Sequence, residues 1–269
     1  MSLALSYWDG ALAIVRRDRA AFLSYRLRFM SQTLAAFFSV VLFYYISRLV
    51  KVSTFGSSDN YFAYVVVGLV IMSSLVSTLS MLPMRIRQEL VAGTLERLLL
   101  SPFGPVPAIV AMLVFPFLLA IVNGVITISF AGLVFHMPIR ATAPLALPAA
   151  ALGAFAFAPF ALFAAAIIVV AKQAQGGVGF LVTGISLIGG FFFPIALLPH
   201  WIQWASEVQP FTPALELLRY LLAGTPVSTS VWVAVVKIAA FGGVLLVPAA
   251  WCLALAIRVG QRRGTIMEY

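Results

Sequence analysis

The amino-acid sequence predicts an all-α membrane protein with six transmembrane helices, and two observations predict it. The first is composition: of 269 residues, 63% are hydrophobic and 9% are charged, against roughly 25% charged in a soluble globular chain. The second is the length of the apolar runs, since a helix needs roughly 20 residues to cross about 30 Å of hydrocarbon. Six runs meet that length: 29–50, 61–82, 108–134, 145–171, 178–198 and 231–257.

The segment before the first run, residues 1–28, is expected to form an amphipathic helix in the membrane interface. It carries seven charged residues, which makes it too charged and too long for a cleaved signal peptide. Leu5, Trp8, Leu12 and Val15 recur at three- and four-residue spacing, which is typical of one apolar stripe on a helix. The alternative is a disordered basic leader.

Lysine and arginine positions set the expected orientation of the six-helix domain, residues 29–257. Twelve of these residues fall on the side of the chain termini and five on the other side, so the positive-inside rule places both termini, including a tail over 258–269, in the cytoplasm. The formal charge of +9 is better explained by this membrane-orienting role than by nucleic-acid binding.

The connection between the second and third runs, about 85–102, is more elaborate than a turn. Gly93 can adopt an unusual backbone angle, Thr94 can cap a following helix and Pro102 can end it, which predicts a short helix over 95–101. Leucines on one edge of this helix suit either a lipid surface or the groove of a partner protein: Leu95, Leu98 and Leu99.

The connection before the last run, about 199–225, predicts a pair of half-helices that re-enter the outer leaflet. Thr212 and Pro213 suit the N-cap and first position of a helix, and Gly224 suits its end. Glu216 and Arg219 are one turn apart and are expected to pair. Trp201 is typical of the membrane interface. The alternative is a surface hairpin that only fixes depth in the bilayer.

Two motifs resemble those of a known family. The cytoplasmic connection reads Glu89-x-x-x-Gly93-Thr94-Leu95-Glu96-x-Leu98-Leu99-x-Ser101-Pro102, and the outer connection combines residues 193–201, 209–214 and 218–224. In order and spacing these resemble the signatures of the ABC-2 type transporter permeases. With six runs and an amphipathic leader, the resemblance covers essentially the whole chain.

The resemblance implies an exporter subunit of the bacterial plasma membrane. Such a permease pairs with a second permease copy, identical or homologous, and with two ATP-binding subunits, which bind ATP and Mg. Coupling to those subunits is implied for Glu89, Gly93, Thr94, Leu95, Glu96, Arg97, Leu98, Ser101 and Pro102, with Trp8 and Arg16 in the leader. An outer gate is implied for Pro199, Trp201, Pro210, Thr212, Pro213, Glu216 and Arg219.

The residues themselves exclude an ATPase of the P-loop type in this chain. That motif requires a lysine directly after a glycine, and none of Lys51, Lys172 and Lys237 follows one. No cofactor is therefore expected on this chain. No cluster of ligands suggests a metal site either, and the single cysteine, Cys252, lies inside the last apolar run.

The substrate is the least determined feature. Because almost no formal charge lies deep in the runs, an apolar or amphipathic cargo is favoured: a drug, a lipid-like molecule or a glycolipid or glycan. Aromatic side chains are weak candidates for the path, since packing is their commoner role: Tyr44, Tyr45, Phe191, Phe192 and Phe193. The alternative function is an ion-coupled secondary transporter, but no acidic residue lies within a predicted run.

Overall fold

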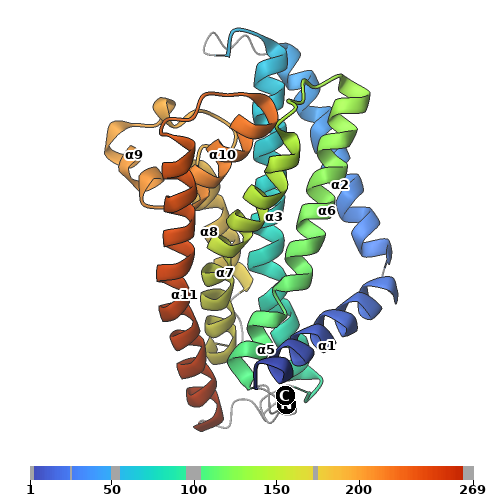
Figure 1. The fold of residues 1–269 in the computed structure, drawn as a ribbon, viewed down its shortest axis with the longest axis vertical. Coiled ribbons are helices and arrows are strands. Elements are labelled where there is room, and N and C mark those ends of the chain that lie inside the picture. The colour runs from blue at the N-terminus through green and yellow to red at the C-terminus, as the bar shows by residue number, and fades with distance from the viewer. Residues whose placement is uncertain (1–2, 25, 50–54, 95–103, 172–174, 263–269) are drawn as a thin grey trace.

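The computed structural model describes residues 3–24, 26–49, 55–94, 104–171 and 175–262; most of these residues are helical, and no strand occurs in these ranges. The all-α prediction is confirmed. Figure 1 shows two distinct ends of the helix bundle. We call the base the end where α1 (Leu3–Ser24) lies and α11 (Val231–Arg262) finishes. The crown is the other end, formed by α9 (His200–Glu207) and α10 (Phe211–Ala223).

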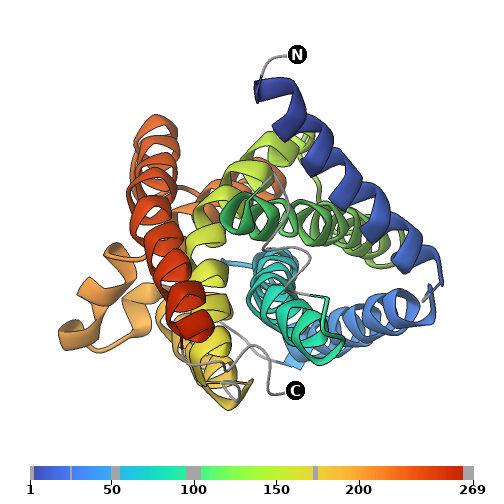
Figure 2. The same cartoon turned by 90° about the horizontal axis from the view of Figure 1, so that it is seen from below.

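The predicted leader helix is present as α1. It lies across the base at a steep angle to the bundle, as Figures 1 and 2 show, and it contacts α5 (Pro105–Ala111) and α6 (Val114–Phe135). The next helix, α2 (Arg26–Leu49), starts three residues before the predicted run. The face of α1 that meets the bundle differs from the predicted stripe: Ile14 packs into the core and Asp18 is buried, whereas Leu12 is partly exposed.

The longest helix is α3 (Ser58–Val91), and it lies at the centre of the bundle. The Ser57 hydroxyl caps it by accepting a hydrogen bond of 3.2 Å from the Asn60 N–H. Its 34 residues extend about 51 Å, well beyond the thickness of a hydrocarbon layer. The predicted run 61–82 is therefore only the middle of α3. Because Ile86 and Leu90 are buried one turn apart, the apolar face continues and 85–91 is helix rather than connection.

The remaining long helices follow the predicted runs closely. α5 and α6 are separated by a short break and together form the third candidate span. α7 (Ala146–Ala171) follows a 3-10 turn over Ala143–Leu145, and it packs along α11.

The fifth predicted run, 178–198, needs correction, because it is not one continuous helix. α8 covers only Gln175–Ile188, 14 residues or about 21 Å. The chain then leaves the helix at Gly189, and Gly190 has a φ of 71°, which a residue with a side chain rarely adopts. A 3-10 turn, Ile195–Leu197, follows. Among the described residues, five helical segments are long and apolar enough to cross a membrane.

Apolar residues are both buried inside the bundle and exposed on its outside. Inside, buried side chains from α3, α7, α10 and α11 pack together, with Phe191 and Phe211 almost completely covered. Outside, exposed apolar residues recur every three or four positions along α2 and the first half of α6, which is expected where helices face lipid: Leu34, Phe38, Leu42, Tyr45, Leu49, Val114, Leu118, Val122 and Val125.

Candidate functional site

At the base, α3 ends in a turn that depends on Gly93. The Gly93 N–H donates to the Leu90 carbonyl at 3.1 Å, and the Thr94 N–H donates to the Glu89 carbonyl at 3.0 Å. These two bonds form a Schellman motif, which needs a left-handed residue at its centre. Gly93 has a φ of 64°, so the unusual backbone angle predicted there is confirmed. A methyl group at Gly93 would meet no neighbour, so the requirement for glycine is conformational.

Two ion pairs connect the same end of α3 to α1. Arg17 of α1 lies 2.9 Å from Glu89 of α3, and Arg85 of α3 pairs with Asp18 of α1. The Asp18 side chain is only 2% exposed, whereas Arg17 is about half exposed. A buried carboxylate needs a cationic partner, and Arg85 supplies it. Arg17 also lies 3.4 Å from Asp18. Asp18 is therefore the buried anchor, shared by Arg85 and Arg17, while the pair of Arg17 with Glu89 is its solvent-facing neighbour.

Glu89 connects these ion pairs to Thr94, the last described residue before 95–103. Besides pairing with Arg17, its carboxylate accepts a hydrogen bond from the Thr94 hydroxyl. Charges and hydrogen bonds thus form one continuous chain of contacts from α1, through α3, to Thr94. We call Arg17, Asp18, Arg85, Glu89 and Thr94 the base network.

The base network includes some predicted coupling residues and some that sequence reasoning missed. Glu89 and Thr94 are in it, and Gly93 adjoins it; Trp8 and Arg16 lie in α1, where Arg16 is exposed. Arg17, Asp18 and Arg85 were missed. For Asp18 the available signal was an acidic residue between two arginines, Arg17 and Arg19. The other predicted residues lie outside the described ranges: Leu95, Glu96, Arg97, Leu98, Ser101 and Pro102.

At the crown, Arg219 of α10 joins three separate parts of the chain. Its Nε donates to the Tyr64 carbonyl at 3.2 Å, its Nη1 to the Gly190 carbonyl at 2.9 Å and its Nη2 to the Phe191 carbonyl at 2.7 Å. The guanidinium also lies 3.3 Å from the centre of the Tyr64 ring, and the Tyr64 hydroxyl donates to the Gly190 carbonyl at 3.1 Å. Together we call these contacts the Arg219 anchor.

The anchor explains how a charge is accommodated in an apolar core. Gly190 and Phe191 follow the end of α8, where carbonyl groups have no helical partner. The guanidinium carries five N–H donors in a fixed fork and satisfies both carbonyls. Burial lowers the pKa of Arg219 to about 10, so the side chain remains charged at neutral pH. The close approach also requires Gly68, because a methyl group there would overlap the Phe191 carbonyl.

Two predictions for this segment are wrong. Glu216 and Arg219 do not pair: Glu216 instead accepts a hydrogen bond from the Ser228 hydroxyl at 2.7 Å, because three backbone carbonyls occupy the guanidinium. Thr212 is not the N-cap of its helix either. α10 begins at Phe211 after Pro210, with no side-chain cap, and Thr212 accepts a hydrogen bond from the Gln209 side chain.

Other predictions for the crown hold. The two short helices expected between 199 and 225 are α9 and α10, and Gly224, with a φ of 76°, closes α10. Pro199 directly precedes α9, Trp201 is about three-quarters exposed and Pro213 lies buried in the first turn of α10. Whether these helices re-enter a bilayer stays a prediction.

The five aromatic residues proposed for a substrate path are not brought together around one cavity. Tyr44 packs against Phe62 and Phe135, and Tyr45 is exposed. After α8, Phe191 is fully buried, and the ring of Phe192 stacks on an aromatic ring of α2. Phe193 is partly buried. Packing accounts for Tyr44, Phe191 and Phe192.

Comparison with known proteins gives a match that covers most of the chain. The model of the ABC-2 type transporter family matches residues 11–223. The matched region includes α2 to α10 together with the base network and the Arg219 anchor. No curated protein matches the sequence.

Proposed function

This chain belongs to the ABC-2 type transporter family, and we propose that it is the permease of an ATP-driven exporter in a bacterial plasma membrane. The family makes it a multi-pass permease component rather than an ATPase, and implies association with an ABC ATP-binding subunit. The finer proposal is that two permease copies, identical or homologous, enclose the pathway, and that two ATP-binding subunits power them with ATP and Mg.

The proposed topology has six crossings and a cytoplasmic base. α1 and the end of α11 lie at the same end of the bundle (Figure 1), so the chain must cross an even number of times. Five helical segments are long enough, and α8 with residues 189–198 would supply the sixth crossing. The positive-inside rule supports a cytoplasmic base, because the described arginines of α1 and of the ends of α3 and α11 gather there: Arg16, Arg17, Arg19, Arg85, Arg87, Arg258 and Arg262.

The proposed coupling runs from residues 95–103 into α3. In the proposed complex this segment rests in a cleft of the ATP-binding subunit, and closure of that subunit pushes on it. The base network supports this role, since Thr94 and Glu89 join the segment to both α1 and α3. A displacement of residue 95 would therefore move α1 and α3 together.

One observation carries the proposal: α3 bears both the base network and the Arg219 anchor. Tyr64 and Glu89 lie on this one helix, about 38 Å apart at 1.5 Å per residue. Movement imposed at Glu89 is thereby connected to Tyr64, to α10 and to the chain after α8. On this reading, α9 and α10 form the outer gate, with Arg219 at its attachment to α3.

The proposed cargo is apolar or amphipathic: a drug, a lipid-like molecule or a glycolipid or glycan. The described acidic residues support this, because they lie in α1, in the short helix α10 or at helix ends, and not in the middle of a candidate span: Asp9, Asp18, Asp59, Glu89, Glu207 and Glu216. A permease without mid-membrane carboxylates is poorly suited to bind a strongly cationic solute.

The test begins with purification of the tagged chain from its native membranes. We expect an ABC ATP-binding subunit to copurify and ATP hydrolysis to accompany it. Inverted vesicles should then accumulate apolar or amphipathic compounds only when ATP is supplied. Accumulation driven by a proton or sodium gradient without ATP would instead support a secondary transporter and overturn the proposal.

A further inference from the structure

Two neighbouring residues of α2 reach two different helices of the bundle. Gln32 donates from its side-chain amide to the Ser77 hydroxyl of α3 at 2.8 Å, and the Thr33 hydroxyl donates to the Asn123 side-chain carbonyl of α6 at 2.9 Å. All three helices contribute to candidate spans, and hydrogen bonds between helices are one of the forces that associate them in a bilayer. These bonds matter most for α2, because only 6% of its most apolar stretch is buried inside the bundle.

A small cavity lies between the same three helices. Its volume is about 10 Å³, close to the about 10–15 Å³ that one water molecule requires. Its lining holds no charged side chain and contains four polar ones: Gln32, Ser73, Ser77 and Asn123. A cavity of this size and polarity admits one water molecule and excludes anything larger.

The hydrogen-bonding capacity around this cavity is only partly used. Asn123 is 4% exposed and Ser77 is 9% exposed. Asn123 accepts a hydrogen bond from Thr33, but its own amide N–H groups donate to no described residue. Ser77 accepts from Gln32, and among the described residues its O–H has no acceptor and the Gln32 carbonyl oxygen has no donor. Buried polar groups without partners cost free energy, so these donors and this acceptor favour a bound polar molecule.

We propose that the cavity holds one ordered water molecule, which accepts hydrogen bonds from the Asn123 amide and the Ser77 hydroxyl and donates one to the Gln32 carbonyl oxygen. Three such bonds are typical of a buried water, and here they come from three different helices. The water thereby completes the attachment of α2 to α3 and α6. The inference stands apart from the proposed exporter function, because it concerns binding within one chain and requires no ATP.

The test uses the two asparagines of the chain, Asn60 and Asn123. The protein carries isotope-labelled asparagine in bilayers of chain-deuterated lipid, and solid-state NMR measures magnetisation transferred from water to the side-chain amides. Asn60 is exposed at the start of α3, so it should always receive the transfer, and Asn60→Ser assigns the two signals. Asn123 is buried within a candidate span, so we expect transfer to it only through the proposed water.

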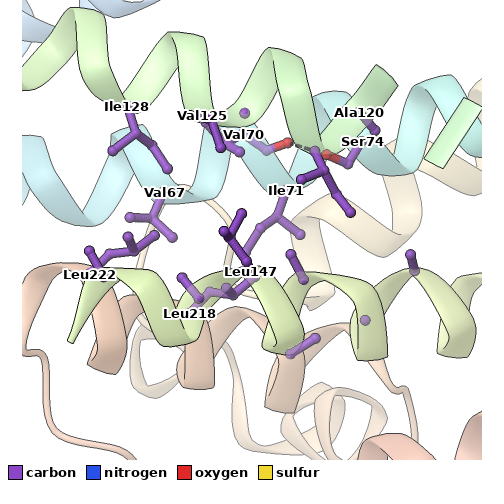
Figure 3. Close-up of a pocket in the computed structure, with 18 of the residues that line it drawn as sticks. Val67, Val70, Ile71, Ser74, Ala120, Val125, Ile128, Leu147, Leu218 and Leu222 are labelled. Carbon is purple, nitrogen blue, oxygen red and sulfur yellow. Dashed lines mark hydrogen bonds between the residues drawn. The ribbon is translucent and has the colours of Figure 1, made fainter. Parts of the chain in front are cut away.

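Ser73 and Ser74 provide a matched pair of variants. Both hydroxyls donate to the Val70 carbonyl, at 2.8 and 2.9 Å. Ser73 lines the small cavity, whereas Ser74 lines a separate apolar cavity between α3, α6 and α7, where Figure 3 shows it bonded to Val70. Ser73→Val should therefore fill the water site and abolish transfer to Asn123, and Ser74→Val should leave that transfer unchanged.

Two results would overturn the proposal: no transfer to Asn123 in the unaltered protein, or equal transfer to Asn123 in the two serine variants. Both variants retain the Thr33 hydroxyl, so relay through that group cannot produce a difference between them. If Ser73→Val fails to fold, Ser73→Thr adds a single methyl group to the cavity and makes the same test. Loss of ATP-driven transport with the NMR transfer unchanged would affect only the exporter proposal.

Discussion

Tyr64 and Glu89 lie on the same helix, α3, and each is connected to a different mobile partner in the proposed mechanism. Glu89 pairs with Arg17 of α1 at 2.9 Å, and Tyr64 accepts a hydrogen bond from Arg219 of α10 at 3.2 Å. Because α3 joins the two ends of the bundle, changes at either residue should be detectable at the other. The predictions below separate coupling from stability.

Removing the Arg17–Glu89 ion pair should weaken coupling more than stability. Because Arg17 is about half exposed, Arg17→Gln should cost less than about 1 kcal/mol of unfolding free energy. Transport per ATP hydrolysed should nevertheless fall in vesicles that contain the ATP-binding subunit. Arg19→Gln, which removes another exposed charge of α1, is the control and should leave that ratio unchanged. An equal loss in both variants would point to net charge instead of the ion pair.

Removing the buried carboxylate of Asp18 should weaken stability more than coupling. Asp18→Asn leaves Arg85 without its carboxylate partner in a mostly covered position, so we expect a loss of about 2–3 kcal/mol. Thermal unfolding in detergent measures the loss. The double variant with Arg85→Gln should recover part of it, because no unpaired charge then remains. No recovery would mean that Asp18 stabilises α1 through contacts other than Arg85.

Arg219 should not tolerate lysine. A lysine ammonium cannot reproduce the planar fork that reaches Tyr64, Gly190 and Phe191, so Arg219→Lys should leave buried carbonyls unsatisfied and cost about 2–4 kcal/mol. The matched control is Arg140→Lys at the crown, where the guanidinium is exposed and lies 5.8 Å from the centre of a tyrosine ring. Its unfolding temperature should change little. Equal shifts in the two variants would contradict the Arg219 anchor.

Thr78→Val should stabilise the protein in the absence of any added ligand. The change removes a buried hydroxyl that has no partner in the described residues and keeps the shape of the side chain, so a gain of about 1–3 kcal/mol is expected. Thr127→Val is the control, because the Thr127 hydroxyl is equally buried but donates to the Asn123 carbonyl at 2.8 Å. Calorimetry of both variants should give shifts in unfolding temperature that differ in sign or size.

The sequence was most informative where apolar pattern alone determines structure. Hydropathy located the cores of α3, α7 and α11, Gly224 was correctly predicted to close a helix, and Gly93 was correctly predicted to adopt an unusual backbone angle. Hydropathy did not predict the break inside the run 178–198. Gly189, Gly190 and Phe191 are as apolar as a span, but hydropathy does not record where backbone carbonyls find their donors. Only the tertiary position of Arg219 accounts for the end of α8.

Charged residues show the same limit. Local spacing suggested that Glu216 pairs with Arg219, because the two are one turn apart. The fold gave Arg219 three carbonyls instead, which are distant in sequence. Asp18 and Arg85 pair across 67 residues. No single-sequence rule links such positions, and the base network therefore emerged only from the structure.

The most direct test of the central claim is the ratio of substrate transported to ATP hydrolysed in proteoliposomes that contain the permease and its ATP-binding subunit. The account predicts that Gly93→Pro and Glu96→Lys lower this ratio strongly while membrane insertion and assembly remain intact. The first change breaks the Schellman turn after α3, and the second reverses a charge in the proposed coupling segment. An unchanged ratio in both variants, with substrate-stimulated ATP hydrolysis as in the unaltered protein, would contradict the account.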